Sequence, residues 1–250
     1  MTTQNPPASD SPGVAFLRAE GVTVTYRNGA KGVQGIDLLV PDAGICAVLG
    51  RNGAGKTSFL RAVAGFLPTE RVRVGGTVAV TGTPVAGKSP AAARRAGVVF
   101  IPERDKVFPS LSVAQHFKFV AGGRSFEELT VGFEGLRGQA ARAAGLLSGG
   151  QRQMLALAVA FAQKPSLLLI DELSLGLAPI FVKDLMRIIR ERAAAEHMAV
   201  VVVEQDAANA LAVSDLTYVF DQGLKVWEGA SSETTAGELG RRYLGLVGAE

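Results

Sequence analysis

Hydrophobic residues in the first hundred positions fall into short runs that are typical of β-strands. These runs lie at 16–20, 22–26, 36–40, 45–49, 77–81 and 98–101. Asn28-Gly29 stands between the second and third runs and predicts a hairpin-type turn. A short helix is expected at 90–96. This half of the chain therefore predicts an antiparallel β layer that leads into a parallel, helix-covered sheet.

Helical and strand patterns alternate in the second half. Helices are expected at 151–162, 179–196 and 207–213, and strands at 167–170, 199–203, 218–220 and 225–227. Before them, helix-like stretches lie at 111–121 and 140–146, and a glycine-rich segment separates the two. We expect a small helical subdomain at about 109–163, within one α/β domain that spans 14–250.

One glycine-rich segment follows the apolar run 45–49 and precedes a helix that starts near Ser58. It reads Gly50-Arg51-Asn52-Gly53-Ala54-Gly55-Lys56-Thr57 and matches the phosphate-binding pattern G-x-x-x-x-G-K-[ST]. Glycines let backbone N–H groups surround an anion, and a helix N-terminus adds partial positive charge. Lys56 would reach the β- and γ-phosphates, and the Thr57 hydroxyl would bind Mg²⁺. The flanking strand and helix favour a nucleotide-binding loop over a glycine-rich turn that binds nothing.

A second motif lies where the apolar run 167–170 ends in Asp171-Glu172. Such a pair downstream of a phosphate loop is a Walker-B-type feature. Asp171 would hold Mg²⁺, commonly through water. Glu172 would orient or deprotonate the attacking water as a general base. Acidic residues also end many strands without any such role, but the phosphate loop favours the functional interpretation.

A third motif is Leu147-Ser148-Gly149-Gly150-Gln151, which lies 23 residues before Asp171 when counted from Ser148. A hydroxyl and two glycines at a helix N-terminus can bind an anion or simply cap the helix. This pentapeptide in this place resembles the signature of the ABC-transporter ATPases. The resemblance extends from about Val14 onward and implies a P-loop NTPase fold of the ABC ATPase type, with ATP and Mg²⁺ as cofactors. It also implies a head-to-tail dimer in which the signature of one subunit contacts the nucleotide on its partner's loop.

The resemblance assigns roles to three more residues. Tyr26 matches the aromatic residue that stacks on adenine, although a half-buried strand tyrosine is the simpler alternative. Glu103 stands where most members have a glutamine that senses Mg²⁺ and faces the transmembrane partner; a carboxylate can bind Mg²⁺ but cannot donate an amide hydrogen bond. Gln205 occupies the place of a histidine that contacts the γ-phosphate, and it cannot carry a proton. Ala178 replaces a common aspartate.

Four segments resemble one subgroup, the ATPase subunits of branched-chain amino-acid importers that have Gln at this switch position. They are Pro102-Glu103, 107–113, 174–179 and Val203-Glu204-Gln205. The resemblance implies transmembrane permease subunits, a second ATPase subunit and, indirectly, a solute-binding protein as partners. It places the chain peripherally on the cytoplasmic face of the membrane. Urea, short amides and aromatic amino acids stay open as solutes.

Other function classes remain as alternatives. Soluble ABC proteins of DNA repair or translation usually have tandem ATPase domains, coiled coils or metal hooks, and one domain without such insertions is not what we expect of that class. An ATP-gated clamp with weak hydrolysis would fit Gln205 and Ala178, whereas the retained Glu172 argues for catalysis. The signature segment disfavours a phosphate-loop kinase or GTPase.

Composition changes this picture little. The net charge is only +3, and the basic residues do not form a pattern typical of a nucleic-acid-binding surface. No nucleic-acid partner is therefore expected. No apolar run approaches the roughly 18–20 residues that span a bilayer. Residues 1–13 are polar and Pro/Ser-rich, which predicts a flexible tail and not a signal peptide. The single cysteine, Cys46, lies in an expected core strand and is consistent with a reducing cytoplasm.

Overall fold

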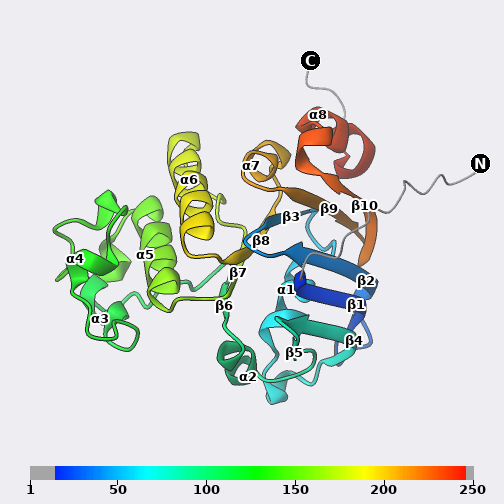
Figure 1. The fold of residues 1–250 in the computed structure, drawn as a ribbon, viewed down its shortest axis with the longest axis horizontal. Coiled ribbons are helices and arrows are strands. Elements are labelled where there is room, and N and C mark those ends of the chain that lie inside the picture. Colours follow the sequence, from blue (N-terminus) through cyan, green and yellow to red (C-terminus); the bar gives the residue numbers. More distant parts are fainter. Residues whose placement is uncertain (1–14, 246–250) are drawn as a thin grey trace, which may run out of the picture.

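Two sheets and a group of helices make up the computed structural model, which describes residues 15–245 (Figure 1). The smaller sheet is antiparallel, with the strand order β2-β1-β4-β5. Its strands are β1 (Ala15–Thr25), β2 (Lys31–Pro41), β4 (Arg73–Val80) and β5 (Thr83–Pro84). The runs predicted at 16–20 and 22–26 form one strand, whose pairing shifts register around Gly21. The predicted turn at Asn28-Gly29 joins β1 to β2.

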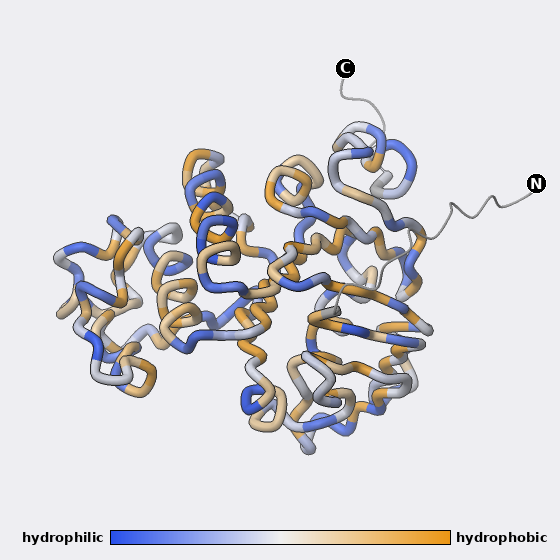
Figure 2. Tube along the Cα trace, viewed as in Figure 1, coloured by the Kyte–Doolittle hydropathy of each residue, from blue (hydrophilic) through white to orange (hydrophobic). Residues whose placement is uncertain are grey.

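The larger sheet has the strand order β10-β9-β3-β8-β7-β6. Its strands are β3 (Ile45–Leu49), β6 (Val98–Ile101), β7 (Leu167–Asp171), β8 (Ala199–Glu204), β9 (Leu216–Asp221) and β10 (Leu224–Ala230). All are parallel except β10, which pairs antiparallel with β9. Every residue of β3, β7 and β8 is buried, which explains their unbroken apolar runs (Figure 2). Because the strands are parallel, the segments that follow β3, β7 and β8 meet at one edge of the sheet.

Helices cover both faces of this sheet. The α-helices are α1 (Lys56–Ala64), α2 (Pro90–Arg95), α3 (Val113–Phe117), α4 (Phe126–Leu129), α5 (Gly149–Ala162), α6 (Pro179–Ala195), α7 (Ala207–Leu211) and α8 (Ala236–Leu239). Short 3₁₀ turns lie at Pro68–Glu70, Glu134–Leu136, Ala144–Leu146 and Ser231–Glu233, and one π-helical turn at Gly240–Leu244. The helix α1 packs between the two sheets, whereas α5 and α6 cover the opposite face of the larger sheet. In Figure 1, α3 and α4 lie beyond α5, away from both sheets.

Two helix predictions in the middle of the chain are wrong in extent. The helix expected at 111–121 covers only Val113–Phe117, and the stretch 140–146 contains only a 3₁₀ turn. The second stretch instead pairs with residues 109–114, through bonds that include Val113 N–H to Arg142 C=O (2.9 Å). Those bonds satisfy backbone groups that a helix would otherwise have paired.

The flexible tail predicted for residues 1–13 lies outside the described residues. Within residues 15–245, no helix combines the length and apolar character needed to span a membrane.

Candidate nucleotide-binding site

The phosphate loop connects β3 to α1 at the edge of the larger sheet. Gly55 is the N-cap of α1 and has a left-handed backbone, with φ of 99°. A Cβ at this position would lie 2.2 Å from the carbonyl oxygen of Gly32, so no larger residue fits without movement. Gly53 is also left-handed, with φ of 81°. The backbone of the loop thus depends on glycine both at Gly55, which the motif fixes, and at Gly53, which the motif leaves free.

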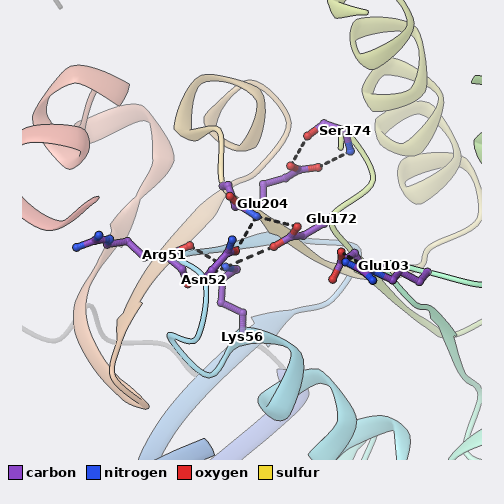
Figure 3. Close-up of polar contacts among 10 residues, drawn as sticks. Arg51, Asn52, Lys56, Glu103, Glu172, Ser174 and Glu204 are labelled. Atoms are coloured by element: carbon purple, nitrogen blue, oxygen red, sulfur yellow. Dashed lines mark hydrogen bonds and ion pairs between the residues drawn. The ribbon is translucent and has the colours of Figure 1, made fainter. Parts of the chain in front are cut away.

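Lys56 lies folded beneath this loop and is only 4% exposed. Its Nζ donates to the carbonyl oxygens of Gly50 (2.7 Å) and Arg51 (3.1 Å), and Glu172 Oε1 lies 3.6 Å away (Figure 3). Burial lowers the pKa of Lys56, while Glu172 and Asp171 oppose the shift. Oxygen atoms of the protein therefore surround the ammonium group, which is expected to bind phosphate oxygens when a nucleotide is present.

Asp171 ends β7 and is buried, yet neither of its carboxylate oxygens has a hydrogen-bond partner among the described residues. Burial raises the pKa of this carboxyl group, while the positive charge of Lys56 opposes the rise. Unpaired buried carboxylates are uncommon, and oxygen ligands of this kind suit Mg²⁺. The Thr57 hydroxyl and the Asp171 carboxylate would be its protein ligands, and oxygens of phosphate and water would complete the shell. The residues fit the ion.

Glu172 follows directly and has a left-handed backbone, with φ of 48°. Its Oε2 accepts a hydrogen bond from Gln205 Nε2 (2.8 Å), which also donates to Asn52 Oδ1 (2.9 Å). Gln205 comes just after β8, whereas Asn52 belongs to the phosphate loop. The three strands β3, β7 and β8 thus bring the predicted catalytic groups into direct contact.

A cavity of about 610 Å³ opens between these segments. The predicted residues that line it are Tyr26, Asn52, Gly53, Ala54, Gly55, Lys56, Thr57, Ser58, Glu103, Glu172 and Gln205. The predicted signature, Ser148–Gln151, does not line it. Instead, Ser148 Oγ accepts from the Gln151 N–H (3.2 Å) and Gln151 Oε1 accepts from the Ser148 N–H (3.0 Å), which caps α5. Within one chain, the signature and the phosphate loop do not share a site.

Comparison with known proteins decides the family. The family model described as "ABC transporter" matches residues 33–174, which is more than half of the chain. The chain belongs to the ABC transporter family. The resemblance inferred from the motifs is confirmed, and this ABC ATPase has the P-loop fold that the motifs imply.

Several curated relatives resemble this ABC ATPase over most of its length. A probable branched-chain amino acid transport ATP-binding protein, LivF of Archaeoglobus fulgidus, is 31% identical over 79% of this chain and 85% of its own. The high-affinity branched-chain amino acid transport protein BraG of Pseudomonas aeruginosa is 31% identical over 80% of this chain and 86% of its own. The lipopolysaccharide export protein LptB of Escherichia coli K12 is 30% identical over 93% of this chain and 98% of its own.

Solved structures agree on the fold. An ATP-binding cassette of an ABC transporter in its ADP conformation has a TM-score of 0.74, at 23% identity, and the match covers 88% of this chain and 92% of the cassette. At that identity the likeness concerns the fold alone. The curated relatives are named for different solutes, so the solute of this ABC ATPase stays a prediction.

Tyr26 lines the cavity together with residues of the phosphate loop. Its hydroxyl is 2.7 Å from Ser58 Oγ, and its ring meets Phe66 edge-on at a centroid distance of 6.3 Å. We expect Tyr26→Ala to raise the KM for ATP about tenfold, because base stacking contributes about 1–3 kcal/mol. Steady-state ATPase assays measure this, and kcat should change less than about twofold.

Tyr26→Phe separates the ring from the hydroxyl. This variant keeps the stacking surface and loses only the bond to Ser58, so its KM should stay within about threefold of the parent. Equal effects of the two substitutions would show that the hydroxyl matters and not the ring. An unchanged KM in Tyr26→Ala would contradict adenine stacking.

The sequence motifs assigned no role to four charged residues near this site. Lys31 and Arg104 line the cavity, and Arg104 also pairs with Glu103 at 3.3 Å. Glu204 is almost fully buried, and burial raises the pKa of its carboxyl group. Burial also lowers the pKa of Lys106 to about 8. The available signal was a charged residue, Glu204, at the end of an apolar strand.

Proposed function

We propose that this ABC ATPase powers an importer of branched-chain or related amino acids. One observation supports its catalytic core above others. Glu172 contacts both Lys56 and Gln205 at the cavity, and it directly follows Asp171, whose buried carboxylate has no hydrogen-bond partner among the described residues. Two relatives whose names specify branched-chain amino acid transport support the solute class. The Gln205 that follows β8 matches the subgroup inferred from sequence.

Each group of the site has a distinct role in this proposal. Lys56 would leave its carbonyl partners and bind the β- and γ-phosphates. Thr57 and Asp171 would hold Mg²⁺, with Glu103 beside it, and the ion neutralises charge on the phosphates. Glu172 would orient the attacking water and accept its proton. The Gln205 amide would donate to the γ-phosphate while it keeps Glu172 in place.

The signature segment acts in trans in this proposal. Ser148 and Gly149 are exposed at the N-terminus of α5 and do not line the chain's own cavity. In a head-to-tail dimer, Ser148, Gly149 and Gly150 would contact the nucleotide on the partner's phosphate loop. The second ATPase subunit would be another copy or a different chain, and permease subunits would place the complex on the cytoplasmic face of the membrane. A solute-binding protein would contribute indirectly.

Affinity purification tests the transporter assignment. In mild detergent with ATP, the chain with Glu172→Gln should retain its partners, because ATP stays bound while hydrolysis stalls. Mass spectrometry is expected to identify two polytopic membrane proteins and a second ATPase, and a co-purified solute-binding protein would narrow the substrate. Recovery of the chain alone, of ribosomes or of DNA-repair factors would contradict the importer and favour a soluble ABC ATPase.

An ATP-gated clamp with weak hydrolysis is the second candidate, favoured by Gln205 in place of a histidine. Comparison of the assembled complex with and without Gln205→His distinguishes the two. A clamp predicts very slow turnover that the histidine accelerates, whereas the importer proposal predicts substantial turnover with Gln205 itself.

A further inference from the structure

The strand-end segment 172–174 is held in place through its backbone. The Glu172 N–H donates to the carbonyl oxygen of Val203 (3.0 Å), and the Glu172 carbonyl oxygen accepts from Lys106 Nζ (3.4 Å). The left-handed region that Glu172 occupies is disfavoured for residues other than glycine, and such conformations persist only where the surroundings enforce them. The contacts around this segment are therefore part of what sets the direction of the Glu172 side chain.

Two buried side chains hold the next two residues. Gln153 Nε2 donates to the Leu173 carbonyl oxygen (2.9 Å). The Glu204 carboxylate accepts from both the backbone N–H (3.1 Å) and the hydroxyl (2.5 Å) of Ser174 (Figure 3). Gln153 is 7% exposed and Glu204 is 1% exposed. Hydrogen bonds shielded from water in this way fix their partners more strictly than bonds at a surface.

Burial of the polar side chains of Gln153 and Glu204 costs free energy. Gln153 is a buried polar residue of α5, and its Oε1 has no hydrogen-bond partner among the described residues. An apolar side chain of similar length would avoid that cost. Among the described residues the Gln153 side chain makes one hydrogen bond, to the carbonyl oxygen of Leu173, the residue after Glu172.

We propose that Gln153 and Glu204 are positioning residues that hold segment 172–174 and so direct the Glu172 carboxylate toward the attacking water. This inference rests on the proposed catalytic role of Glu172. Gln153 reaches the segment from the helix that begins with the signature, whereas Glu204 reaches it from β8, one residue before Gln205. Since neither side chain lines the cavity, neither is expected to touch the nucleotide.

The test compares Gln153→Met, Glu204→Ala and Glu204→Gln in the full-length chain. Gln153→Met and Glu204→Ala should each lower kcat about tenfold, because small displacements of a catalytic group are costly. The KM for ATP should stay within about twofold, since the phosphate loop is unchanged. Glu204→Gln should restore part of kcat, because its amide oxygen can still accept from the Ser174 N–H.

Gln163→Ala is the matched control. Gln163 is the C-cap of the same helix, and its Nε2 also donates to a backbone carbonyl oxygen, that of Val159 (3.2 Å). Because it lies at the other end of α5 from the signature, its removal should leave kcat and KM unchanged.

Addition of Glu172→Gln to each variant distinguishes a failure of the proposed function from a failure of the positioning inference. In that background, Gln153→Met and Glu204→Ala should cause no further loss of turnover. If Glu172→Gln alone leaves turnover unchanged, the catalytic role of Glu172 in the proposed function is wrong. If Glu172→Gln abolishes turnover but Gln153→Met and Glu204→Ala keep the parental kcat, the positioning inference is overturned. A parallel decline of kcat, ATP affinity and melting temperature would also overturn it, since that pattern reflects a structural role only.

Hydrogen exchange gives a readout that needs no turnover. The Ser174 amide, bound to a buried carboxylate, should exchange slowly in the parent and faster in Glu204→Ala. Equal exchange of peptides covering 172–178 in both proteins would contradict the inference.

Discussion

Glu172→Gln is expected to lower kcat for ATP hydrolysis by about 10²-fold or more. A general base contributes about 10²–10⁴-fold, and glutamine cannot accept the proton. The substitution should not weaken ATP binding. Glu172 Oε1 lies 3.6 Å from Lys56 Nζ, so its charge competes with phosphate for that ammonium group. Removal of the charge should leave the Kd for ATP equal or lower, as measured with a fluorescent nucleotide.

Glu191→Gln provides the control for this experiment. Glu191 lies on the exposed face of α6, where it pairs with Arg187 at 2.8 Å. Loss of that surface pair should change neither kcat nor Kd. Parental turnover in Glu172→Gln would show that another group activates the water.

Lys56→Met is expected to weaken ATP binding by about 10²-fold. The ammonium group would form several charge-assisted bonds to phosphate, together about 3 kcal/mol, and 1.4 kcal/mol corresponds to a factor of ten. Titration calorimetry measures the change. Methionine fills a similar volume, so the fold around the 4%-exposed side chain should persist.

The same substitution should also affect the stability of the protein without nucleotide. It leaves the largely buried Glu172 without its nearest cation, so the melting temperature should fall unless Glu172→Gln is added. Lys88→Met removes an exposed lysine and should leave ATP affinity unchanged. Parental ATP affinity in Lys56→Met would contradict the assignment of Gly50–Thr57 as the phosphate loop.

Local sequence alone predicted the parts of this site that depend on neighbouring residues. The glycine pattern of the phosphate loop, the acidic pair at the end of β7 and the cap of α5 each need only a few consecutive residues. The buried strands β3, β7 and β8 were equally clear, because central parallel strands are apolar on both faces. The stretch 140–146 was misread because its alanine-rich composition favours a helix, whereas pairing with residues 109–114 determines its backbone.

Contacts between distant segments could not be predicted this way. Ser174 and Glu204 are thirty residues apart, and Gln205 and Asn52 are 153 apart. Such pairs form only because adjacent parallel strands end at the same edge, and no local pattern encodes which side chains then meet. The sequence by itself determined the family, and it predicted the phosphate loop and the acidic pair. The tertiary structure decided the left-handed backbone of Glu172, the hydrogen bonds that hold it and the separation of the signature from the chain's own cavity.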